Sequence, residues 1–101
     1  MTIDLLRWKI VGHQTLTVSS TAVGFTVAGT NVERARCAVK TANIRWRADD
    51  TDPTASIGEP AGPGELVRAF IIDGSDIPDF KAIRQSSDDA ELNIIYEARL
   101  P

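Results

Sequence analysis

The chain has 101 residues, of which 43% are hydrophobic and 25% charged, and its formal net charge is −3 at pH 7. This length matches one domain, and the apolar fraction is sufficient for a hydrophobic core. The net negative charge argues against a nucleic-acid-binding protein, which normally carries a basic excess. No apolar run is long enough to cross a bilayer. The single cysteine excludes an internal disulfide and a cysteine-based metal cluster.

Short segments of alternating apolar and polar residues, separated by turn-forming residues, predict an all-β fold. The first candidate strand is residues 6–10, which Gly12 is expected to end, and residues 15–18 and 23–27 are the next two. His13, the only histidine, is expected in an exposed turn between the first two strands. A lone histidine without an acidic neighbour is weak evidence for catalysis.

The stretch from residue 35 to residue 49 is too long to be one simple strand. Its apolar positions up to residue 39 fall on one face, whereas those from Ile44 onward fall on the other. A bulge or a tight connection at residues 41–43 would produce this change, and the lack of a glycine there favours a bulge. Cys37 is expected to be a buried structural residue rather than a reactive thiol.

Residues 49–64 contain three of the five prolines and are expected to form the longest loop. Long loops in compact domains are often functional or form interfaces. Asp49, Asp50 and Asp52 could ligate calcium, but the spacing is not that of an EF-hand, and aspartates are common in turns. We therefore expect neither a metal nor another cofactor.

The second half of the chain continues the β pattern. Residues 65–72 are apolar on both faces, which predicts a strand buried on both sides or one that contacts a partner subunit. Apolar residues then recur at a spacing of three, which predicts a short helical turn near residues 76–81. In the last strand, residues 91–97, Leu92, Ile94 and Tyr96 are expected to face the core and Asn93, Ile95 and Glu97 to face outward.

These elements predict a single β-sandwich domain over residues 1–101, jelly-roll-like or immunoglobulin-like, with about seven to nine short strands. No group of titratable residues has a spacing typical of a catalytic site, so we expect no enzymatic activity. Five basic residues lie between positions 34 and 47. Two interpretations of these cations stay open, a solvated strand face or an interface with carboxylates of a neighbouring copy.

Several segments occur in an order that resembles a known family: 19–26 (SSTAVGFT), 35–39 (ARCAV), 44–47 (IRWR), 53–58 (PTASIG), 79–84 (DFKAIR), 90–94 (AELNI) and Tyr96. The chain resembles small β-sandwich virion structural proteins of tailed bacteriophages and prophages of Gram-negative bacteria. The family often has Asp-Gly after the strand that corresponds to residues 44–47, where this chain has Asp49-Asp50. The resemblance implies a non-enzymatic virion protein that is assembled in the host bacterial cytoplasm.

Within that family we expect a capsid decoration, or cement, protein that self-associates, as a trimer or else a hexamer, and docks on the major capsid protein or other virion subunits. One alternative is a tail, neck or collar component. Another is a carbohydrate- or receptor-binding module for host attachment, which would need exposed aromatic residues along a groove. All six aromatic residues, however, can be placed in core positions. Binding to nucleic acid or to a membrane is not expected.

The candidate interface combines the outward arginines of residues 44–47, the long loop and the apolar excess of two strands. Its residues are Arg45, Arg47, Pro53, Thr54, Pro60, Pro63, Val67, Ala69, Ile71 and Ile95. Residues 1–8 are a candidate arm that could contact a neighbouring subunit.

Overall fold

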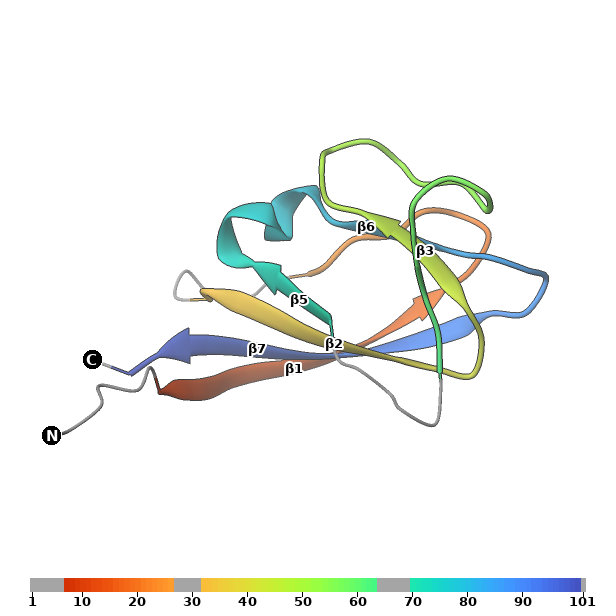
Figure 1. The fold of residues 1–101 in the computed structure, drawn as a ribbon. Helices are drawn as coiled ribbons and strands as arrows, with labels where there is room; N and C mark the ends of the chain where they lie inside the picture. The colour runs from red at the N-terminus through yellow and green to blue at the C-terminus, as the bar shows by residue number, and fades with distance from the viewer. Residues whose placement is uncertain (1–6, 27–31, 64–69, 101) are drawn as a thin grey trace, which may run out of the picture.

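Two antiparallel β-sheets face each other across a hydrophobic core in the computed structural model (Figure 1). The structure describes residues 7–26, 32–63 and 70–100. Within these ranges it confirms the all-β prediction, with seven strands and one 3₁₀-helix. The elements are β1 (Trp8–Val18), β2 (Arg34–Lys40), β3 (Ile44–Arg47), β4 (Glu59–Ala61), β5 (Phe70–Asp73), η1 (Gly74–Asp79), β6 (Lys81–Arg84) and β7 (Ala90–Arg99).

The strands form a four-stranded sheet in the order β1-β7-β2-β5 and a three-stranded sheet in the order β4-β3-β6. The predicted strand at residues 23–27 is reduced, in its described part, to a single bridge. Val23 and Ala82 exchange two backbone hydrogen bonds of 2.9 and 2.8 Å, which place residue 23 beside β6. Figure 1 shows that β1 and β7 run side by side, and the register pairs the first residue of β1, Trp8, with the last residue of β7, Arg99. There the Leu100 amide donates to the Arg7 carbonyl at 2.9 Å.

The first two predicted strands are in fact one continuous strand, β1. Its register with β7 shifts between Ile10 and Gly12, so that Val11 is the extra residue of a β-bulge. Gly12 therefore does not end a strand. A Cβ atom there would lie 3.5 Å from the ring of Tyr96, which is an ordinary contact, so no close approach requires a glycine at this position. His13 is exposed, as expected, but it lies within β1 and not in a turn.

The change of face at residues 41–43 is confirmed, but the bulge interpretation is wrong. The chain leaves the four-stranded sheet at Lys40 and enters the three-stranded sheet at Ile44. Thr41 makes this tight connection with a φ of 79°, and the Ala42 amide donates to the Lys40 carbonyl at 3.0 Å. Such a φ is unusual for a β-branched residue, so the absence of glycine was a misleading guide.

The core lies between the sheets and is built from the inward positions of the alternating strands. β2 contributes Cys37, which is fully buried as predicted, and β7 contributes Leu92, Ile94 and Tyr96. Phe80, also fully buried, follows η1, and its ring stacks on Phe25 with 4.1 Å between centroids. The apolar positions of both sheets therefore pack into one cluster.

The helical turn predicted near residues 76–81 is confirmed as η1, although η1 begins and ends two residues earlier. Its buried residue is Ile77. The predicted long loop at residues 49–64 is interrupted by β4. Of the strand predicted at residues 65–72, β5 contains the last three residues, and residues 65–69 lie outside the described ranges.

Candidate functional site

The face of the four-stranded sheet that is turned away from the core is the first candidate site. Strand register places two rows of outward side chains across its four strands, and these rows define what we call the outer face. The rows are His13–Ile95–Arg36–Ile71 and Ile10–Glu97–Arg34–Asp73. Two predicted interface residues, Ile71 and Ile95, thus share one row, with Arg36 between them.

Exposed aliphatic side chains are prominent on and beside the outer face. Ile10, Val11 and Ile71 are 46%, 44% and 49% exposed, and Ile95 is half-buried. Ile10 and Val11 were not among the predicted interface residues, because the pattern of β1 reads as two strands when the bulge at Val11 is not recognised. The other two aliphatic candidates, Val67 and Ala69, lie outside the described residues.

A charge network lies beside these aliphatic side chains. The Arg34 Nε donates to Glu97 Oε1 at 2.6 Å, and Arg36 Nη2 is 3.6 Å from Glu97 Oε2. Glu97 faces outward as predicted, yet it is only 4% exposed. The Arg34 guanidinium lies 3.7 Å from the centroid of the Trp8 ring, in a cation–π contact. Trp8 is therefore a residue of the outer face, and its placement in the core was wrong.

Arg45 and Arg47 lie on the other sheet and bind residues of their own chain. Arg45 Nη1 donates to the Gly58 carbonyl at 3.0 Å, while its Nε is buried and has no partner among the described residues. Arg47 forms a two-bonded ion pair with Asp49, which raises the pKa of Arg47 and lowers that of Asp49. Arg45 therefore holds the long loop in place, and the interface role of both arginines stays a prediction.

The proline-containing loop offers less surface than the sequence indicated. Pro53 is buried, which contradicts its assignment to an interface. Thr54 is exposed, and its Oγ1 accepts hydrogen bonds from the amides of Ser56 and Ile57 at 3.3 and 3.0 Å. Pro60 and Pro63 are exposed, so they stay available for a partner. Within the described ranges no group of three or more histidines, cysteines or carboxylates could hold a metal ion.

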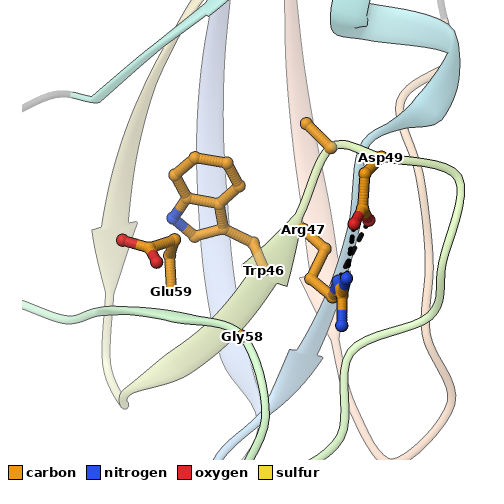
Figure 2. A pocket seen from close by; sticks show the side chains of 6 residues that line it. Trp46, Arg47, Asp49, Gly58 and Glu59 are labelled. Carbon is orange, nitrogen blue, oxygen red and sulfur yellow. Dashed lines mark hydrogen bonds and ion pairs between the residues drawn. The ribbon is translucent and has the colours of Figure 1, made fainter.

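Trp46 lines two open hollows. The first, of about 460 Å³, is lined by Trp46, Arg47, Ala48, Asp49, Gly58 and Glu59 (Figure 2). The second, of about 390 Å³, shares Trp46 and Glu59 and is also lined by Phe70. The Trp46 ring stacks on that of Phe70 with 5.0 Å between centroids. The first hollow has two carboxylates, Asp49 and Glu59. Asp49 is paired with Arg47, whereas Glu59 makes no ion pair among the described residues.

Two groups of the core have strongly shifted pKa values. Burial raises the pKa of the Cys37 thiol to about 12. The pKa of the Tyr96 hydroxyl is raised to about 12, mainly by burial and to a smaller extent by the nearby Cys37. Cys37 faces the core and His13 lies on the outer face, so the two cannot act together as a nucleophile and base.

The comparisons with known proteins add no relative to this description. No protein-family model, no curated protein and no solved structure matches the chain. In the described part of the chain, no helix has the length and apolar character needed to cross a membrane.

Proposed function

We propose that the chain is a non-enzymatic structural protein of a tailed-bacteriophage particle, and specifically a head-decoration protein that self-associates and docks on the major capsid protein. The observation that carries this proposal is the outer face, which combines exposed aliphatic side chains with charges that are already paired. The order of the sequence segments that resemble virion proteins supplies the assignment to a phage particle.

The outer face has the physical properties of a docking surface. Its side chains stand on strands that are fixed by neighbours in the sheet, so little conformational entropy is lost on binding. Arg34 and Arg36 are held by Glu97 before any partner arrives. Removing Ile10, Ile71 and Ile95 from water would then stabilise a complex, with roughly 800 Å² buried on each partner in an interface of standard size. When the contact is repeated over a capsid shell, the stabilisation adds up over all copies and opposes expansion of the shell.

Self-association is tested by measuring the molar mass with light scattering at micromolar and higher concentrations. We expect a closed oligomer, a trimer or a hexamer. The variants Ile71→Lys and Ile95→Lys should lower the molar mass, since each replaces an aliphatic side chain of the outer face with a charged one. Ser75→Lys is the control, because Ser75 is exposed in η1, outside both the outer face and the long loop. An unchanged mass in both outer-face variants would remove this face from the interface.

The location in the particle is tested by mixing the tagged chain with purified heads and purified tails of the phage or prophage that encodes it. Co-sedimentation with heads is the expected result. Co-sedimentation with tails or head–tail connectors would instead favour a tail, neck or collar component. Binding to neither would contradict the virion assignment.

A carbohydrate-binding module is the second candidate, because half-buried Trp46 lines both hollows together with the exposed Glu59. Trp46 can be monitored alone in a Trp8→Phe background, since these are the two tryptophans. Titration with host-surface oligosaccharides should then leave its fluorescence unchanged if the chain is a decoration protein. A saturable change that Glu59→Gln abolishes would favour the binding module.

A further inference from the structure

The two sheets have four edges, and three of them are short or covered. β4 has three residues, and one of them is Pro60, which has no amide hydrogen. The described part of β5 has four residues, and Val23 forms a bridge with β6 at the edge of that sheet. Short strands and prolines are the usual ways in which proteins protect sheet edges from unwanted pairing.

The fourth edge, formed by β1, lacks these protections. β1 has eleven residues. Within the described ranges no strand pairs with its free edge, the edge that faces away from β7. Its bulge lies near one end, so the segment from Gly12 to Val18 keeps a regular register with β7. The sequence also contains no Asp, Glu, Lys or Arg between Lys9 and Glu33. Charged side chains, which commonly protect an edge strand, are therefore missing along this segment.

We propose that the β1 edge from Gly12 to Val18 pairs antiparallel with the same segment of a second copy, which joins two four-stranded sheets into one continuous sheet. This inference rests on the self-association in the proposed function and names its contact. A two-fold axis through the middle of the segment would give each edge-facing amide and carbonyl a partner on the other copy.

The side chains of this segment are compatible with those of the same segment in a second copy. With the axis at Thr15, Thr15 would lie opposite Thr15 of the second copy and His13 opposite Thr17, all on the outer side of the sheet. Lys9 would face a second Lys9 only if the pairing were centred on residue 9. No register centred on residues 13–17 therefore places like charges opposite each other. A peptide of another protein has no such built-in match, which favours a second copy as the occupant.

The pairing has a consequence for the oligomeric state. A contact with a two-fold axis joins copies in pairs, so the assembly must contain an even number of chains. A hexamer can combine this contact with a second contact through the outer face, and a dimer can form through the edge alone. A trimer cannot contain it once in every copy.

The test is a charge exchange at Thr15, which is exposed on β1. Thr15→Lys and Thr15→Glu should each lower the molar mass measured by light scattering at least twofold, because like charges would lie close together across the edge. An equimolar mixture of the two variants should restore the mass of the unmodified chain. Ser75→Lys and Ser75→Glu are the controls, since Ser75 is exposed in η1, which follows β5 at the opposite edge of the sheet. Circular dichroism would verify that each variant is folded.

Amide hydrogen exchange gives a second readout that does not need a variant. In a free edge strand every second amide faces solvent, so slow and fast exchange alternate along residues 13–17. In the paired edge all these amides should exchange slowly. Alternating exchange in an associated chain, a trimeric mass, or no restoration on mixing would overturn the edge pairing and leave self-association standing. A monomer at all concentrations would overturn both the edge pairing and the proposed self-association.

Discussion

Glu97 shows how a charged side chain can be buried on a face that is turned away from the core. Its neighbours across β2 are Arg34 and Arg36, and the Trp8 ring covers Arg34. A buried carboxylate is costly unless cations and hydrogen-bond donors compensate for its lost hydration. The two arginines provide this compensation, so the network stabilises the junction of three strands only while it is complete.

Removal of the Glu97 carboxylate is therefore expected to destabilise the fold. Glu97→Ala should lower the free energy of unfolding by about 2–3 kcal/mol, which is below the value for a fully buried pair because Arg36 is partly exposed. Glu91→Ala on the same strand should cost under about 0.5 kcal/mol, since its pair with Lys40 is exposed and 4.0 Å long. Urea unfolding measures both changes, and equal losses would show that the Glu97 network is no stronger than a surface pair.

The shifted pKa values of Cys37 and Tyr96 predict a loss of stability in alkali. Both folded-state pKa values, about 12, lie above the ordinary values of 9.0 and 10.0, so folding favours the neutral forms. This contribution is complete below about pH 9 and decreases as the pH rises toward 12. Urea unfolding between pH 7 and 11 should show the decrease.

The same burial predicts that Cys37 of the folded chain does not react with a thiol reagent at pH 8, and that it reacts promptly in urea. Rapid labelling without denaturant would contradict this picture of the core.

At the residue scale, the alternation of apolar and polar residues predicted which way a side chain faces but not how deeply it is buried. The outward direction of Glu97 and the inward direction of Cys37 both follow from the period of two in a strand. The burial of Glu97 depends on Arg34 and Trp8, which are 63 and 89 positions away in the sequence. No local pattern contains such contacts, so the network could not be predicted.

At the scale of elements, the connection between β3 and β4 depends on Gly58. Its φ is +136°, and a Cβ atom there would lie 3.0 Å from the Trp46 carbonyl oxygen and 3.2 Å from the Pro53 Cβ. The carbonyl of the same residue accepts the hydrogen bond from Arg45. Gly58 thus allows the loop to approach β3 closely enough for the arginine to hold it.

Gly58→Ala should therefore destabilise the fold by about 1–3 kcal/mol, through backbone strain and the displaced loop. Gly12→Ala is the matched control, because a Cβ atom there makes an ordinary contact of 3.5 Å with Tyr96. Its effect should stay within about 0.5 kcal/mol. Thermal or urea unfolding of the two variants makes the comparison, and equal stabilities would remove the special role of Gly58.

The order and type of the elements were more predictable than their boundaries. The turn at η1 followed from apolar residues at a spacing of three, and β7 followed from clean alternation. The division of β1 was an error because the Val11 bulge interrupts the alternation just as a turn would. Thr41 was misjudged because its left-handed backbone is imposed by the passage between sheets and not by its own preference.

At the scale of the whole molecule, one aromatic cluster joins the two sheets. Phe80 contacts Phe25 by stacking, and its ring centroid lies 5.7 Å from that of Trp46 and 6.2 Å from that of Phe70. These residues belong to different strands and loops of both sheets, so neither sheet keeps its apolar face covered without the other. The sandwich should consequently unfold in a single cooperative step.

Phe80→Leu should cost about 1–2 kcal/mol and leave the transition cooperative, because leucine fills most but not all of the space. Circular dichroism reports the strands and tryptophan fluorescence reports the cluster, and their unfolding curves should coincide. Ile57→Leu on the exposed loop should change the stability by less than about 0.5 kcal/mol. Separate transitions in the two signals would mean that the sheets unfold independently.

The side-by-side course of β1 and β7 also determines what can be attached to this protein. The backbones at Arg7 and Leu100 are joined by a hydrogen bond, so segments attached at these two residues would leave the sandwich at the same end. A short peptide could likewise connect Leu100 to Arg7, while a new start is opened in the turn at residues 85–89 between β6 and β7. Such a circular permutant should fold to the same sandwich, and proteins fused to its new ends would leave it beside the turn at residues 85–89.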